Sequence, residues 1–301
     1  MTLILDRPTD WLPRLTTALE GIELITDPTQ LAKLSQDYYT FSPVLVRLLS
    51  DKRGEIVVRP SSEAEVLRVA SACVALKVPL TVRGAGTGNY GQCVPLHGGV
   101  ILDVSKMQQI RWIQPGMACV EPGVKMAAFD KKAREQGWEL RMVPSTYRTA
   151  TIGGFVGGGS GGAGSVTYGQ LRDRGNLQAV RVVTLEDEPR VITLRGDDVY
   201  KVAHAYGTNG IITELEIPLA PAYPWAEVIV AFSDFMQAAR FGQALADSDG
   251  LVKKLVCVLA HPLPTYFTAL SRSIPADHHV VLVMVAEPSL ESFQELVKAW
   301  D

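Results

Sequence analysis

The chain has 301 residues, of which 47% are hydrophobic and 20% are charged, and its formal net charge at pH 7 is −3. These values are typical of a soluble globular protein with one large domain or two ordinary ones. The lack of a basic block argues against nucleic acid as a main partner. The four cysteines form neither a CxxC pair nor a metal-ligand spacing, so no metal site is predicted and free thiols suit a reducing cytoplasm.

The N-terminus does not resemble a secretory signal, because Asp6, Arg7 and Pro8 interrupt it before an apolar core can form. No apolar run approaches the ~20 residues that a membrane-spanning helix needs. The sequence therefore predicts a cytoplasmic protein without a membrane span.

Residues 1–54 are predicted to form a helical segment. Leu12, Leu15 and Leu19 lie near helical spacing, and several prolines in the same stretch keep the helices short. The pattern changes after this segment.

The next residues alternate between strand and helix. Strands are predicted at 55–59, 79–83 and 99–104, and Ser61 or Ser62 caps a helix between the first two. The second strand runs directly into a glycine-rich loop.

Short strands dominate the region 110–222, with one predicted helix at 124–136. The strands are predicted at 118–121, 177–185, 190–194 and 211–219. A proline-containing linker at 221–224 introduces a different order, which is strand, helix, strand, strand, helix. These elements are predicted at 226–232, Asp234 to Leu245, 251–260, 279–286 and 290–300.

The first glycine cluster, Gly86-Thr-Gly88-Asn-Tyr-Gly91, matches the pattern G-x-G-x-x-G. A Rossmann fingerprint would require a helix directly after the glycines and an acidic residue about 20 residues later, and neither is present. A phosphate nest of backbone N–H groups fits better, although a glycine turn without a ligand stays open. Arg83 at the loop entrance could supply a compensating charge or could lie solvated at the strand end.

The second cluster has nine glycines in the 17 residues that begin at Gly153. Each fixed glycine costs on the order of 0.5–1 kcal/mol relative to alanine, so a folded protein keeps such a tract where side chains must be absent. A flexible linker is the alternative, but patterned strands flank the tract closely. A large planar ligand lying against bare backbone is the favoured interpretation.

The third cluster, Gly207-Thr-Asn-Gly210 followed by Ile211-Ile212, indicates a turn into a strand and is weak evidence by itself. The three clusters together, in this order and spacing, resemble the flavin-binding module of the p-cresol methylhydroxylase-type (vanillyl-alcohol oxidase) family. Within that family they resemble the glycolate oxidase and D-lactate dehydrogenase branch. The resemblance covers residues 55–221.

The resemblance implies an α+β fold with three parts. The helical segment at 1–54 precedes a two-subdomain FAD-binding domain of the vanillyl-alcohol oxidase type at 55–222. Residues 223–301 resemble the start of a ferredoxin-like substrate-cap domain that stops before its closing strand.

The resemblance also implies how FAD is held. The first loop would bind the diphosphate, Ala150-Thr-Ile-Gly-Gly154 would lie along the ribityl chain and flavin ring, and the backbone at Ile211 and Ile212 would meet the pyrimidine edge. The implied cofactor-binding residues are Arg83, Gly84, Ala85, Gly86, Thr87, Gly88, Asn89, Pro144, Thr151, Ile152, Gly153, Gly154, Gly207, Gly210, Ile211 and Ile212.

Two departures from the family qualify this expectation. Relatives that bind flavin covalently have a histidine near the position of Thr87, so noncovalent FAD is expected here. Phe155 and Gly159 replace the family's asparagines, which removes polar contacts around the flavin ring.

The implied activity is FAD-dependent oxidation of a small 2-hydroxy acid of the glycolate or D-lactate type, or the flavin-binding portion of such an enzyme. The family's H-x-G-D-G-N-like segment with its catalytic histidine is absent, so no catalytic residue is assigned and the chain alone is expected to be a poor catalyst. A noncatalytic flavin-holding or assembly subunit of a multi-subunit dehydrogenase is an alternative. A nucleotide-binding module without redox chemistry is a third. Both alternatives that bind flavin, the oxidoreductase and the flavin-holding subunit, allow a partner subunit or an electron acceptor.

Overall fold

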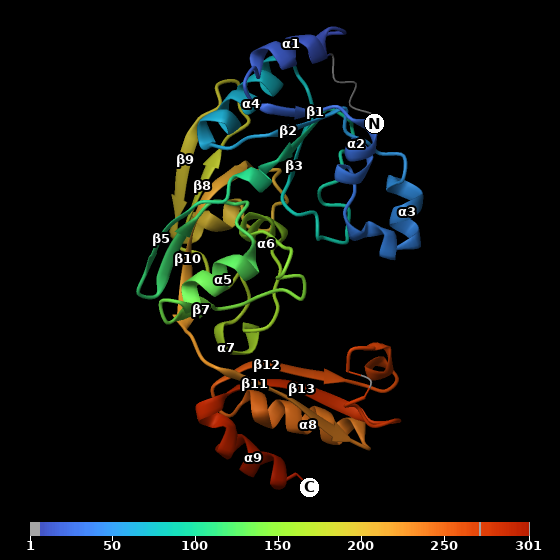
Figure 1. Cartoon of the computed structure of the whole chain (residues 1–301), viewed down its shortest axis with the longest axis vertical. Coiled ribbons are helices and arrows are strands. Elements are labelled where there is room, and N and C mark those ends of the chain that lie inside the picture. Colours follow the sequence, from blue (N-terminus) through green and yellow to red (C-terminus); the bar gives the residue numbers. More distant parts are fainter. Residues whose placement is uncertain (1–6, 271, 301) are drawn as a thin grey trace. The chain divides into compact units, whose positions relative to one another are not determined.

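The computed structural model describes residues 7–270 and 272–300, so residues 1–6, which lack a signal pattern in the sequence, lie outside it. The chain divides into two compact units. Unit 1 comprises residues 1–140, 144–160 and 171–220, and unit 2 comprises residues 141–143, 161–170 and 221–301. The predicted boundaries at residues 54 and 222 stay predictions. Figure 1 labels the elements of both units.

The first sheet of unit 1 has the strand order β1-β2-β4-β3. Its strands are β1 (Glu23–Ile25), β2 (Ile56–Arg59), β3 (Leu80–Arg83) and β4 (Val100–Asp103). Strands β2, β3 and β4 are parallel to one another, and all three confirm the prediction. Strand β1 is antiparallel to β2 and was not predicted. With three residues, β1 has no strand pattern of its own and owes its conformation to pairing with β2.

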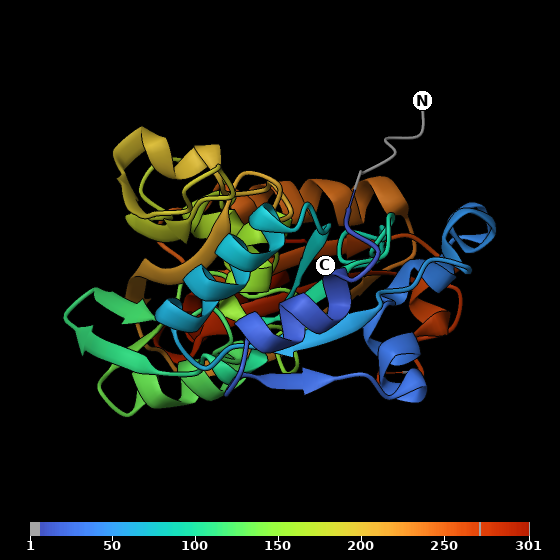
Figure 2. The same cartoon turned by 90° about the horizontal axis from the view of Figure 1, so that it is seen from above.

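Helices cover both faces of this sheet, because its buried side chains alternate between them. Ile56, Val58 and Leu102 share one core with the two helices that lie side by side in Figure 2. These helices are α1 (Trp11–Ala18) and α4 (Glu63–Ala75). Val57 and Ile101 point to the other face, where Leu31 and Leu34 of α2 (Pro28–Leu34) pack. The next helix, α3 (Pro43–Leu49), packs instead against Tyr39 and Val94.

The second sheet of unit 1 is antiparallel and has the order β5-β6-β10-β8-β9, with β7 also paired to β10. Its strands are β5 (Ile110–Gln114), β6 (Met117–Val120), β7 (Trp138–Leu140), β8 (Ala179–Val183), β9 (Val191–Arg195) and β10 (Ile211–Pro221). Of these, β5 and β7 were not predicted. The predicted helix at 124–136 is confirmed as α5 (Met126–Arg134).

The glycine tract contains two helices that were not predicted, α6 (Ile152–Gly158) and α7 (Ser165–Tyr168). Four of the seven residues of α6 are glycine, the poorest helix former after proline. Thr151 caps its first turn, since its Oγ1 accepts a hydrogen bond from the Gly154 N–H at 3.3 Å. The helix therefore depends on its surroundings rather than on the propensity of its residues.

Unit 2 contains a three-stranded antiparallel sheet in the order β11-β13-β12. Its elements follow the predicted order and are β11 (Trp225–Phe232), α8 (Phe235–Ala246), β12 (Lys253–Leu259), β13 (His279–Ala286) and α9 (Leu290–Lys298). Phe241 of α8 and Phe293 of α9 share one core with the sheet, so both helices cover the same face, as in a ferredoxin-like fold. Asp234 caps α8, as predicted.

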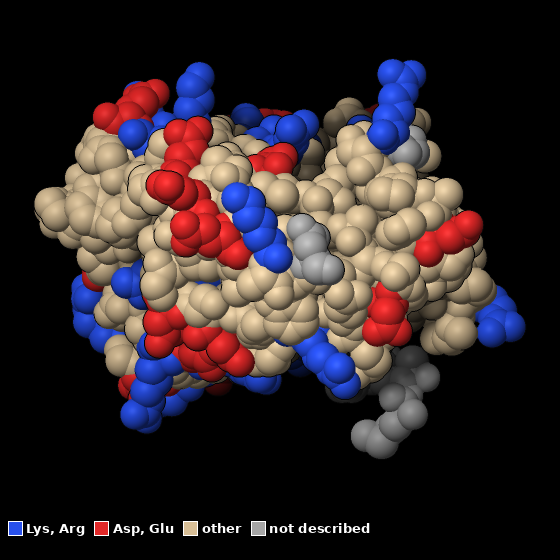
Figure 3. Space-filling view, turned by 90° about the horizontal axis from the view of Figure 1, so that it is seen from below, with Lys and Arg blue, Asp and Glu red and all other residues tan. Residues whose placement is uncertain are grey.

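The face seen from the side of α8 and α9 carries scattered basic side chains, acidic side chains and broad uncharged areas (Figure 3). Among the described residues, no helix is long and apolar enough to cross a lipid bilayer.

Within unit 1, the carboxylate of Glu63 joins α4 to the second sheet. Arg181 of β8 donates to it through Nε at 2.6 Å and Nη2 at 2.8 Å, and Thr213 Oγ1 of β10 donates at 2.7 Å. Burial raises the pKa of Glu63, but the hydrogen bonds from Arg181 and Thr213 outweigh it and hold the pKa below its ordinary value. One ionised group thus joins α4, which packs on the first sheet, to the second sheet.

We expect Glu63→Gln to lower the free energy of unfolding by about 1–2 kcal/mol at pH 7, because three hydrogen bonds lose their ionised acceptor at a half-exposed site. Since the folded-state pKa is depressed, the contribution is present above the ordinary pKa of 4.5 and disappears as the pH falls through the folded-state pKa. Urea unfolding across this pH range measures both effects.

Glu65→Gln is the matched control, because Glu65 also lies in the first turn of α4, but among the described residues its carboxylate accepts hydrogen bonds only from Ser61. Equal losses in the two variants, or a loss in Glu63→Gln that is independent of pH, would contradict the role given to Glu63.

Candidate functional site

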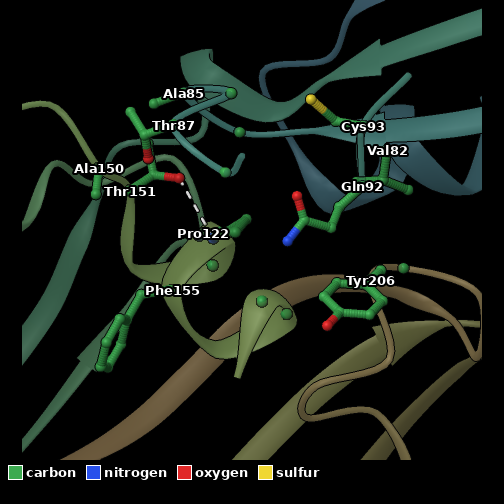
Figure 4. A pocket seen from close by; sticks show the side chains of 18 of the residues that line it. Val82, Ala85, Thr87, Gln92, Cys93, Pro122, Ala150, Thr151, Phe155 and Tyr206 are labelled. Carbon is green, nitrogen blue, oxygen red and sulfur yellow. Dashed lines mark hydrogen bonds between the residues drawn. The ribbon is translucent and has the colours of Figure 1, made fainter. Parts of the chain in front are cut away.

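A pocket that is partly open to solvent lies within unit 1. The three glycine clusters, which are far apart in the sequence, all contribute to its wall (Figure 4). Twelve of the sixteen predicted site residues line it, namely Gly84, Ala85, Gly86, Thr87, Gly88, Pro144, Thr151, Gly153, Gly154, Gly207, Gly210 and Ile212.

Arg83 supports the first loop from behind instead of lining the pocket. Its side chain is buried, and Nη1 donates to the carbonyl oxygens of Leu34 at 3.1 Å and Gln36 at 2.6 Å. A Cβ at Gly86 would lie 2.1 Å from Arg83 Nη2, and Gly86 has a φ of +67°. Only glycine fits there, because the guanidinium already occupies the space of a side chain.

The loop of the first cluster touches the first turn of α6 at Gly84, where no side chain stands between them. A Cβ at Gly84 would lie 2.4 Å from Thr151 Oγ1, the cap of α6, and 3.7 Å from the Gly154 Cα. The loop after β3 therefore rests on the first turn of α6, and this contact closes one side of the pocket.

Two adjacent glycines of α6 line the pocket but differ in their surroundings. Gly153 is buried, and a Cβ there would lie 2.4 Å from the Pro122 Cβ. Gly154 is exposed toward the pocket, and a Cβ there would meet only Thr151 Oγ1, at 3.0 Å. The first glycine allows close packing inside the protein, and the second leaves the pocket wall bare.

The third cluster follows a turn in which His204 and Tyr206 have φ values of 57° and 53°, which are unusual for residues other than glycine. Their backbone N–H groups donate to the carbonyls of Val156 at 3.0 Å and Gly157 at 2.9 Å, at the end of α6. Their side chains bond each other, with His204 Nε2 2.8 Å from the Tyr206 hydroxyl. The turn thus fixes the Tyr206 ring beside the pocket, facing Gln92 across it (Figure 4).

The other predicted residues lie off the pocket. Asn89 is exposed, while Ile152 and Ile211 are buried. Ile211 pairs with Val183 in the second sheet. The Asn89 side chain lies on the loop surface, and the Ile152 and Ile211 side chains lie in the core. The backbone role given to Ile211 stays a prediction.

The sequence reasoning missed several polar and aromatic residues of the pocket, namely Asp37, Gln92, Cys93, Thr146 and Tyr206. Burial raises the pKa of the Cys93 thiol to about 11, so the thiol is neutral at pH 7. None of the residues that line the pocket is a histidine.

Comparison with known proteins agrees with this geometry. Residues 54–193 match the family described as "FAD binding domain", a stretch that contains the first two clusters. The chain is 31% identical over 205 residues to "Glycolate oxidase subunit GlcD" of Escherichia coli, covering 65% of this chain and 40% of that protein. It is 32% identical over 182 residues to "D-lactate dehydrogenase" of Anaerostipes hadrus, covering 56% of this chain and 37% of that protein.

A solved structure, "alkyldihydroxyacetonephosphate synthase", matches with a TM-score of 0.79 at 17% identity, covering 98% of this chain and 59% of that one. The chain spans about 40% of the length of the curated relatives. The predicted vanillyl-alcohol oxidase type of fold is therefore confirmed. Residues 54–193 carry an FAD binding domain, and the chain is homologous to glycolate oxidase subunit GlcD and D-lactate dehydrogenase, as the resemblance implied.

Proposed function

We propose that the chain binds FAD noncovalently in the pocket of unit 1 and serves an oxidoreductase that oxidises a small 2-hydroxy acid of the glycolate or D-lactate type. The observation that carries the proposal is that three glycine clusters, which are far apart in the sequence, contribute to the wall of one pocket. The names of the relatives support the substrate class.

The residues of the pocket fit such a cofactor. Backbone N–H groups of the loop from Gly84 to Gly88 can form a nest for a diphosphate, and the Gly154 backbone can lie flat against a planar ring system. Thr87 offers no group for covalent attachment to flavin. When bound, the flavin supplies the acceptor for a hydride from the substrate's α-carbon, and the chain's own part is to hold and orient it.

The first expectation concerns the identity and attachment of the cofactor. Denaturing the purified protein should release a flavin into the supernatant, and chromatography should identify it as FAD, because a nest for two phosphates binds FAD more tightly than FMN. Flavin that stays with the precipitated chain, or FMN in the supernatant, would contradict the proposal.

The two adjacent glycines of α6 provide a matched pair of variants. Gly154→Val should leave the protein folded but lower its flavin affinity at least tenfold, because the new side chain enters the pocket. Gly153→Ala should instead lower the free energy of unfolding by about 1–3 kcal/mol, because its Cβ collides with Pro122. Flavin titration and thermal unfolding of both variants distinguish these effects, and normal flavin affinity in folded Gly154→Val would refute this placement of the cofactor.

The substrate class is tested by anaerobic addition of glycolate or D-lactate to the flavin-loaded protein, followed by absorption. Loss of the oxidised flavin bands supports an oxidoreductase of this class. Stable bands with both acids would favour the flavin-holding subunit, and a protein that takes up no flavin would exclude both.

A further inference from the structure

We propose that the carboxylate of Asp37 is a cofactor-binding group, which accepts a hydrogen bond from a sugar hydroxyl of the bound dinucleotide. The inference rests on the proposed function, since it assigns to a residue outside the glycine clusters a contact with the same ligand.

Asp37 is buried but incompletely paired. It is 6% exposed, and its Oδ1 accepts a hydrogen bond from the Tyr39 N–H at 2.8 Å. Its Oδ2 is buried and has no hydrogen-bond partner among the residues that the structure describes. An unpaired buried carboxylate oxygen is strongly destabilising, so its presence beside a pocket calls for a further donor.

The electrostatics lead to the same conclusion. Burial raises the pKa of Asp37, and the nearby N–H groups of Tyr39, Gly91 and Gln92 and the charge of Arg83 reduce this rise without cancelling it. The chain therefore offsets only part of the free-energy cost of burying the ionised Asp37 carboxylate.

The position of Asp37 is fixed relative to the first glycine loop. The N–H of the next residue, Tyr38, donates to the Gly88 carbonyl at 2.8 Å, and the carbonyl of the preceding residue, Gln36, accepts from Arg83 at 2.6 Å. Asp37 itself lines the pocket together with Gly88, Gln92 and Cys93. The carboxylate is thus held at the edge of the proposed diphosphate nest.

The chemistry of the ligand follows from that position. A carboxylate repels phosphate, so Asp37 cannot serve the diphosphate itself and must meet a donor beside it. In FAD, hydroxyl-bearing sugars flank the diphosphate on both sides, the ribose on one and the ribityl chain on the other. A sugar hydroxyl is the neighbouring group that can donate to Oδ2.

The test compares Asp37→Asn with the parent chain. Asparagine keeps the shape and an acceptor for the Tyr39 N–H, but it places an N–H₂ donor where Oδ2 was. We expect the FAD dissociation constant, measured by flavin fluorescence, to rise about tenfold to hundredfold. Without flavin, the variant should unfold at the same or a higher temperature, because it no longer buries an unpaired charge.

Asp27→Asn is the matched control, because Asp27 also accepts a backbone N–H, from Gln30 at 2.9 Å, but is exposed and lies off the pocket. It should bind FAD as the parent does. If Asp37→Asn fails to fold, Asp37→Ser takes its place, since a serine hydroxyl can also accept the Tyr39 N–H.

Competition with ADP and with FMN identifies the sugar. Weaker binding of ADP to the variant assigns the ribose, and weaker binding of FMN assigns the ribityl chain. A parent chain that binds no FAD would overturn the proposed function and this inference with it. A parent that binds FAD while the variant binds FAD, ADP and FMN equally well or more tightly would overturn only the role of Asp37.

Discussion

The contact between Gly84 and the first turn of α6 is the constraint on which the pocket depends. The loop after β3 can approach Thr151 so closely only because no side chain stands between them. This approach brings the end of the parallel sheet against the wall carried by the antiparallel sheet. Any side chain at Gly84 would force the two apart and widen the space that the glycines enclose.

Charged side chains hold the same two parts together without entering the pocket. Glu63 bonds Arg181 and Thr213 on the far side of α4, and the buried Arg83 ties the loop to the carbonyls of Leu34 and Gln36. Much of the pocket wall is glycine backbone, which offers few side chains for packing, so ion pairs and buried donors behind the wall hold it in place. This division explains why the sequence concentrates glycine at the surface of the site and arginine behind it.

The sequence predicted the parts that have local signals. Strands β2, β3 and β4 are short apolar runs, and the glycine clusters are visible without a structure. It did not predict α6, because glycine obscures helical periodicity, and it could not tell Gly153, which packs on Pro122, from Gly154, which faces the pocket. Asp37 was missed for a different reason. No motif links residue 37 to a loop near residue 88, and only the folded chain brings them together.

The turn at His204 and Tyr206 has a consequence for the motions of unit 1. Both residues hold left-handed backbone conformations, which cost on the order of 1–3 kcal/mol each, and their N–H groups bond the last carbonyls of the glycine-rich α6. A strained turn thus supports a helix with little intrinsic stability. Release of the turn would relieve its strain and at the same time remove the hydrogen bonds that hold the end of α6. We therefore expect this wall to open at a lower free energy than the rest of the unit. Local opening here would expose the pocket while both sheets stay folded.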